Sequence, residues 1–128
     1  RQSQKIYVAR VMGQVEGDEG IIDLPIIVDW PNRPKQKICH DTGRLAVTQW
    51  QVINRDIKET RLKLKPQTGR SHQLRIHMME FGHPILGDPF YGTPECQTVS
   101  RLMLHSHRLR LRHPDGGESI EFRAKIPF

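Results

Sequence analysis

The chain has 128 residues, a formal net charge of +6 from 20 Lys and Arg against 14 Asp and Glu, and a pI of about 9.7. This length suits one domain with its own hydrophobic core, and the basic excess favours a polyanionic partner, nucleic acid first. Two cysteines without CxxC spacing, and no apolar run of spanning length, argue against a disulfide framework, a zinc site and a membrane partner. We therefore expect a protein of the reducing cytoplasm.

The first predicted element is a strand in KIYVARVMG, residues 5–13, where Ile6 and Val8 alternate with Tyr7 and Ala9. An acidic, turn-like segment follows up to Gly20.

A basic arm is predicted over about residues 21–43, because three prolines interrupt the apolar stretch IIDLPIIVDWPNRPKQK. Proline cannot donate to a strand ladder, so we expect an irregular arm rather than a central strand. The tip of the arm carries Arg33, Lys35 and Lys37. A loop that is simply solvated is the plain alternative.

The second half of the chain predicts a hairpin over 44–55 and 59–66, a helix over about 70–81, and two strands over 101–114 and 119–126. Candidate N-caps of the helix are Thr68 and Ser71, and Gly82 and Pro84 follow its end. The segment GHPILGDPFYG after the helix is typical of a compact loop. The fold class that we expect is α+β, with a mixed, mainly antiparallel sheet and one principal helix.

Residues three and four apart share a helix face, so Leu74, Met78 and Phe81 form an apolar stripe suited to packing on the sheet. His72 and Arg75 lie on an adjoining face. The helix N-terminus attracts a phosphate or carboxylate, and a sheltered Arg75 would need a carboxylate partner. A surface helix whose arginines face water is the alternative.

The histidines of this helix favour structure over metal chemistry. His77 alone is more typical of a hydrogen-bonded histidine in or near the core than of a catalyst. His72 and His77 are five residues apart, which misses the spacing of a zinc-binding helix.

Four ordered motifs resemble the RluA-type pseudouridine synthases: KIYVARV, KPQTGRSHQLRIH, GHPILGDPFYG and RLMLHSHRL. The resemblance runs from Lys5 to the C-terminus. The arm LPIIVDWPNRPKQK is most similar to the family member that modifies both 23S ribosomal RNA and transfer RNA. The resemblance implies that a uridine is flipped out, its N-glycosidic bond is broken, and the base is rejoined through C5 without a cofactor or a metal.

The resemblance also implies roles for single residues. Tyr7 matches the tyrosine that stacks on the target base and takes part in the C5 proton step, and Arg75 matches the arginine that pairs with the catalytic aspartate. Leu104 matches the apolar residue beside the flipped base. Contacts with RNA are also expected. The resemblance suggests them for Arg70, His72 and Gln73 at the helix start, and the basic charge of the arm suggests them for Arg33, Lys35 and Lys37.

The family nucleophile, an aspartate in an HRLD-type motif, is absent from these residues. Asp88 belongs to another family motif and is interpreted as structural. We therefore expect residues 1–128 to be the C-terminal part of a catalytic domain that is inactive alone. Arg75 would then lack its carboxylate, and exposed apolar surface would favour self-association.

Two other hypotheses remain open. One is an RNA-binding module without chemistry, which would use the same arm and helix. The other is a hydrolase or metalloprotein that uses some of the seven histidines, although no nucleophile elbow or ligand spacing supports it. The sequence leaves the target uridine undetermined, because site choice depends on RNA shape.

Overall fold

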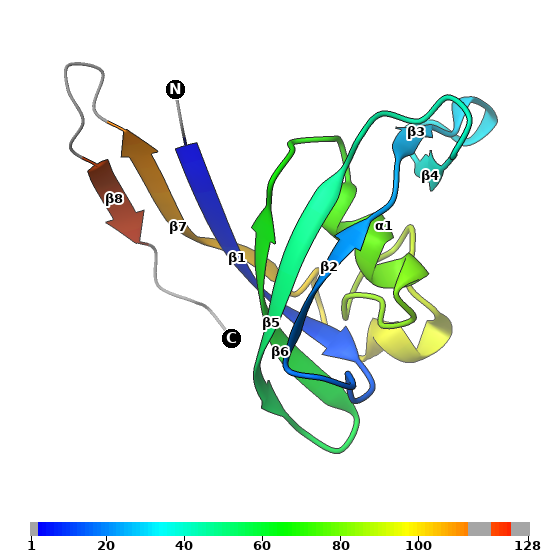
Figure 1. Ribbon diagram of the computed structural model, residues 1–128. Helices are drawn as coiled ribbons and strands as arrows, with labels where there is room; N and C mark the ends of the chain where they lie inside the picture. The colour runs from blue at the N-terminus through cyan, green and yellow to red at the C-terminus, as the bar shows by residue number, and fades with distance from the viewer. Residues whose placement is uncertain (1–2, 113–118, 124–128) are drawn as a thin grey trace.

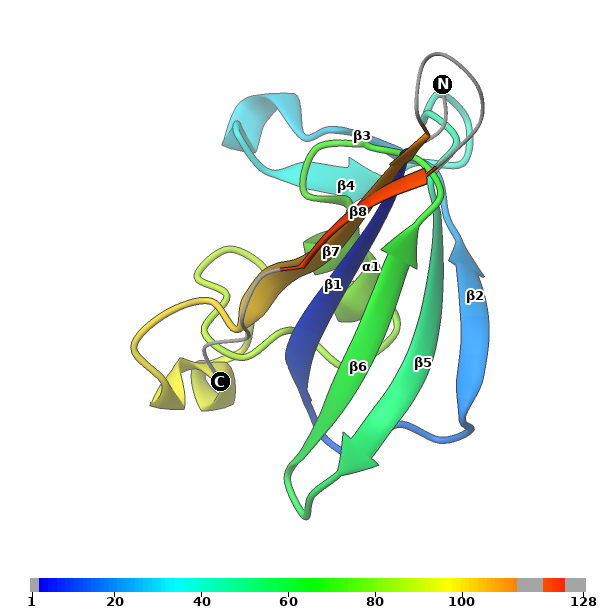
Figure 2. The same ribbon diagram turned by 90° about the vertical axis from the view of Figure 1, so that its left-hand side faces the viewer.

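The computed structural model describes residues 3–112 and 119–123, with side chains for residues 5–107. A six-stranded sheet forms its centre in the order β2-β5-β6-β1-β7-β8, and every pairing is antiparallel. The strands are β1 (Ser3–Met12), β2 (Glu19–Asp23), β5 (Val47–Arg55), β6 (Glu59–Pro66), β7 (Leu104–Arg112) and β8 (Ser119–Arg123). In Figure 2, β2, β5, β6 and β1 lie side by side in front of the helix. The α+β class with a mainly antiparallel sheet is confirmed.

The predicted arm is only partly irregular. Its first residues form the end of β2, which is an edge strand of the main sheet and not a central one. Pro25 lies just after this strand, so it removes no hydrogen bond from the sheet. The rest contains β3 (Ile26–Val28) paired with β4 (Gln36–Ile38), joined through the short 3₁₀ helix η1 (Trp30–Asn32). This small sheet extends beyond the end of the main one (Figure 1).

Helix α1 (Gln73–Glu80) packs on one face of the main sheet. Leu74 and Met78 are buried in the core, and Phe81 packs against it, as the apolar stripe predicts. It is the one α-helix in the part of the chain that the structure describes.

The predicted start of the helix at residue 70 is wrong. His72 is the N-cap, with a left-handed φ of 55° and no side-chain capping bond. The Gln73 side chain organises this turn instead, because its Oε1 accepts hydrogen bonds from the Arg70 N–H at 3.2 Å and the Thr68 hydroxyl at 2.6 Å. Its Nε2 donates to the Val47 carbonyl at 2.9 Å, which joins the turn to the start of β5.

The predicted loop after α1 leads into a second 3₁₀ helix, η2 (Pro94–Thr98), before β7 begins. The predicted strands over 101–114 and 119–126 correspond to β7 and β8, and residues 113–114 and 124–126 of those predictions lie outside the described residues.

Leu62 lies at the centre of the core on β6 and is fully buried. Substitution Leu62→Ala would remove buried methyl groups and leave a cavity, so we expect a loss of about 2–5 kcal/mol in the free energy of unfolding. Ile57→Ala is the matched control, because Ile57 is 82% exposed and should change stability by less than about 0.5 kcal/mol. Urea unfolding measures both; equal effects would contradict this description of the core.

Candidate active site

A cavity of about 470 Å³ opens between β1, the start of β7 and the turn that leads into α1. Six of the predicted site residues line it: Tyr7, Arg70, His72, Gln73, Arg75 and Leu104. Lys5, residues 66–69 and Leu74 complete the wall. Residues almost one hundred positions apart in the chain therefore meet at one site, whose wall is cationic.

Tyr7 lies in the middle of the sheet, with Leu64 opposite it on β6 and Ser106 opposite it on β7. The β1–β7 register shifts between Ile6 and Tyr7. Such irregularities re-aim a side chain next to a functional site. Tyr7 packs against the hydrophobic core and is partly exposed, so its ring is both supported and accessible.

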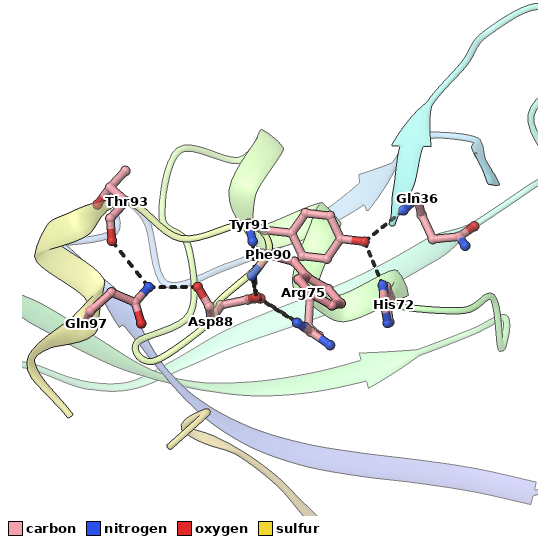
Figure 3. Close-up of polar contacts among 8 residues, drawn as sticks. All are labelled: Gln36, His72, Arg75, Asp88, Phe90, Tyr91, Thr93 and Gln97. Atoms are coloured by element: carbon pink, nitrogen blue, oxygen red, sulfur yellow. Dashed lines mark hydrogen bonds and ion pairs between the residues drawn. The ribbon is translucent and has the colours of Figure 1, made fainter. Parts of the chain in front are cut away.

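Arg75 has a carboxylate partner within the chain, contrary to the expectation that it would lack one. Its Nε lies 3.0 Å from Asp88 Oδ2 and its Nη2 lies 2.8 Å from Asp88 Oδ1, which makes a bidentate pair. Figure 3 shows the Arg75 guanidinium beside the Asp88 carboxylate. The guanidinium is 5.1 Å from the centre of the Phe90 ring and 5.3 Å from that of Tyr91. The sequence motif that contains Asp88 is separate from the one that contains Arg75, so this contact was not predicted.

Asp88 is fully buried and satisfied on all sides. Its Oδ1 also accepts the backbone N–H groups of Phe90 at 2.9 Å and Tyr91 at 3.1 Å. Burial by itself would raise the pKa of Asp88, but the hydrogen bonds from Arg75 and from these N–H groups, with the charge of Arg75, outweigh it and lower the pKa. Asp88 therefore stays ionised and fixes the Arg75 side chain beside the cavity, a structural role in agreement with its interpretation from sequence.

A second set of contacts joins the cavity to the arm. The Tyr91 hydroxyl accepts the backbone N–H of Gln36 on β4 at 2.8 Å and lies 2.6 Å from His72 Nδ1 (Figure 3). Burial raises the pKa of Tyr91, so the phenol keeps its proton and can donate it to His72. Burial and the charge of Arg75 lower the pKa of His72 and favour the neutral ring. A neutral His72 that accepts at Nδ1 carries its proton on Nε2.

The other residues of the helix start that were predicted to contact RNA differ in their exposure and in how far their polar groups are already hydrogen-bonded within the chain. Gln73 lines the cavity but is only 3% exposed, and its amide group is used inside the chain. Arg70 donates from Nε to the Leu45 carbonyl at 2.7 Å, which holds the guanidinium at the mouth of the cavity. Their roles toward RNA stay predictions.

The basic tip of the arm lies outside the cavity wall. The guanidinium of Arg33 is 3.9 Å from the centre of the exposed Trp30 ring, and Lys35 Nζ is 5.8 Å from that of Phe90. Lys37 is exposed on β4. Sequence reasoning missed Trp30 and Tyr91, for which the only available signal was an aromatic residue beside prolines or glycines.

His77 is a core histidine, as predicted. It is fully buried, with Nδ1 2.8 Å from the Thr48 hydroxyl and Nε2 2.9 Å from the Leu24 carbonyl. Burial lowers the pKa of His77. Among residues of the described ranges, no three His, Cys, Asp or Glu side chains are grouped as metal ligands would be, and no helix is long and apolar enough to cross a membrane.

Comparison with known proteins defines the class of this cavity-bearing fold. The family model for RNA pseudouridylate synthase matches residues 1–80, so the chain belongs to that family. The dual-specificity RNA pseudouridine synthase RluA of Yersinia pestis is 55% identical over 130 residues, covering 100% of this chain and 63% of the relative. RluA of Escherichia coli K12 is 52% identical, with 100% and 59% covered. The chain thus spans about three fifths of the length of these relatives.

Solved structures agree with this assignment. Human RNA Pseudouridylate Synthase Domain Containing 1 superposes with a TM-score of 0.85 at 27% identity, covering 98% of this chain and 56% of that one. Human RNA Pseudouridylate Synthase Domain Containing 4 has a TM-score of 0.76 at 26% identity, covering 98% and 58%.

Asp88→Asn keeps the shape of the side chain and removes its charge. Because Arg75 would stay sheltered without a counter-ion, we expect a loss of about 3 kcal/mol in the free energy of unfolding at pH 7. Asp18→Asn is the control, since Asp18 is 93% exposed and pairs with Arg55 at 3.4 Å, so the loss should be below about 1 kcal/mol. Urea unfolding measures both.

The pH dependence of stability gives a second readout of the same pair. The pKa of Asp88 is lower in the folded state, so its stabilisation is fully present above the unfolded value of about 3.9 and is lost as the pH falls through the folded value. Between pH 5 and pH 2 the Asp88→Asn variant should therefore lose less stability than the wild type. Parallel curves would refute an ionised Asp88.

Tyr91→Phe removes the hydroxyl that joins β4 to His72. We expect a loss of about 1–2 kcal/mol in unfolding free energy, because two polar partners lose a hydrogen bond. Hydrogen exchange of the Gln36 amide should become faster, while amides between β5 and β6 serve as the internal control. An unchanged Gln36 rate would mean that the hydroxyl does not hold the arm.

Proposed function

We propose that the chain forms part of the catalytic domain of an RNA pseudouridine synthase that converts uridine to pseudouridine in ribosomal or transfer RNA. The main observation that supports the proposal is that Tyr7, Arg75 and Leu104 line one cavity of about 470 Å³. The family resemblance gives these three residues roles around a single flipped base. Their meeting at one site is what such chemistry requires.

The nucleophilic carboxylate comes from polypeptide outside these 128 residues in this proposal. The Arg75 guanidinium is already oriented for this carboxylate, because Asp88 accepts hydrogen bonds from its Nε and Nη2 and holds it in place. A guanidinium carries five N–H donors, so donors remain for a second carboxylate. Arg75 then keeps that carboxylate ionised and oriented, while Asp88 acts as a positioning residue.

The reaction needs no net exchange of atoms with a cofactor. The C1′–N1 bond of uridine breaks, the base turns within the site, and C1′ bonds to C5. The C5 proton then leaves and N1 gains a proton, so the product is an isomer. In this scheme Tyr7 stacks on the base and serves the C5 proton step, while Leu104 packs against the base and keeps water from it.

RNA is the proposed partner, and its backbone is bound by the cationic residues around the cavity and on the arm. Arg33, Lys35 and Lys37 contribute phosphate contacts that set affinity and salt dependence rather than site choice. The two free cysteines fit a cytoplasmic protein. Exposed apolar side chains such as Ile21 and Leu45, 63% and 60% exposed, would favour self-association of the chain when isolated.

Release of tritium from RNA that carries [5-³H]uridine tests the chemistry. The 128-residue chain alone should show no turnover, whereas fusion to the remaining segments of the Yersinia pestis relative should restore it. Tyr7→Phe in the fusion should lower the rate by about 100-fold or more if Tyr7 serves the proton step.

The control is the same fusion with the HRLD-type aspartate changed to alanine, which should stay inactive. Turnover by the chain alone would refute the need for an external nucleophile. A fusion that binds RNA but never turns over would instead support the hypothesis of an RNA-binding module without chemistry.

A further inference from the structure

A second groove, of about 420 Å³, lies on the other side of the turn that precedes α1. Its walls come from β3 and β4 of the arm, from Arg44, and from residues 69–71. Gly69 and Arg70 line both this groove and the cavity that contains Tyr7. The two sites are therefore neighbours that share a wall of two residues.

The groove combines an apolar floor with cations at its edge. Ile27 and Val28 are half-buried in its wall. Arg44 is exposed, and its guanidinium has no ion pair or hydrogen bond to any residue of the described ranges. Arg70 is held by the Leu45 carbonyl through Nε alone. No acidic residue lines the groove, so its charge complements an anion with an apolar or aromatic group attached.

The fold of the chain does not need a glycine at position 69. Its φ is not in the left-handed region, and a methyl group added there would meet no atom within 4 Å. Packing and backbone conformation therefore place no demand for glycine at this position. The open space over Gly69 lies where a ligand would pass from one site to the other.

The arm is held at a fixed place relative to the cavity. Gln36 lines the groove, and its backbone N–H is bound by the Tyr91 hydroxyl, whose other partner is His72 in the cavity wall. A ligand that occupies both sites thus meets a prearranged surface. Such preorganisation lowers the entropy lost on binding.

We propose that this groove binds the RNA nucleotide adjacent to the one in the Tyr7 cavity, with Arg44 and Arg70 on its phosphate and its base against Ile27 and Val28. The phosphodiester between the two nucleotides crosses over Gly69. The inference rests on the proposed function, because it takes a uridine in the Tyr7 cavity as the starting point. Bases splayed out of their stack are the usual targets of sequence-specific RNA recognition.

Methyl NMR spectra of the chain separate one occupied site from two. Uridine, which has no phosphate, should shift the Leu104 methyl signals and leave those of Ile27 and Val28 in place. The dinucleotide UpU should shift both sets. Leu104 reports the Tyr7 cavity and Ile27 and Val28 report the groove, so failure of the proposed function and failure of the groove give different spectra.

Variants test the residues involved. Arg44→Ala should weaken UpU binding about five-fold and leave uridine binding within about two-fold, since one phosphate contact is lost. Lys58→Ala is the charge-matched control, because Lys58 is exposed in the β5–β6 turn, at the end of the sheet remote from the arm (Figure 1). Gly69→Leu should leave the melting temperature unchanged and abolish the Ile27 and Val28 shifts with UpU.

The inference is overturned if UpU shifts only Leu104, or if Arg44→Ala and Lys58→Ala bind UpU equally well. In both cases the Leu104 shifts would leave the proposed function standing. Spectra in which neither ligand moves Leu104, Ile27 or Val28 would overturn both proposals. Loss of the Ile27 and Val28 shifts in a folded Gly69→Leu variant supports the crossing over Gly69, and their persistence contradicts it.

Discussion

The buried pair between Asp88 and Arg75 is the constraint on which the rest of the site depends. A carboxylate with no exposed surface is stable only when opposite charge and hydrogen-bond donors surround it, and Arg75, Phe90 and Tyr91 supply them. The pair joins the loop after α1 to the first turn of the helix. It thereby fixes a cation at the cavity wall and a tyrosine ring behind it.

From Tyr91 the same network continues into the arm. Its backbone N–H binds Asp88, while its hydroxyl binds β4 and His72. A single residue therefore relates the ion pair, the helix start and the small sheet to one another. The Tyr91 hydroxyl adds to the backbone hydrogen bonds between Ile26 and Arg44, and together they help the arm to present a defined surface beside the cavity.

In the proposed site, two acidic groups have different roles toward Arg75. Asp88 belongs to the chain and positions Arg75, whereas the proposed nucleophile is a second carboxylate that Arg75 would orient in turn. A sheltered arginine with only the external carboxylate would be unpaired whenever that carboxylate was absent. With Asp88 in place, the cation is stabilised before any partner or RNA is bound.

Strands β1, β7 and β8, the β5–β6 hairpin, helix α1 and the family were accessible from the sequence, because period-two and period-3.6 patterns and ordered motifs are local signals. The resemblance also selected Tyr7, Arg75 and Leu104, and the fold brings them together. The start of α1 at Gln73 was not accessible, since the Gln73 amide is bound by Val47, 26 residues away.

The partner of Arg75, the tie through Tyr91 and the groove beside Gly69 depend on which surfaces meet after folding. A polar side chain in a loop has many possible partners in sequence, and only tertiary packing chooses among them. The sequence by itself thus determined the principal strands, the presence of the helix and the chemical inventory of this protein. The tertiary structure alone decided which charges are paired and which space stays open, because both are set by contacts between distant segments.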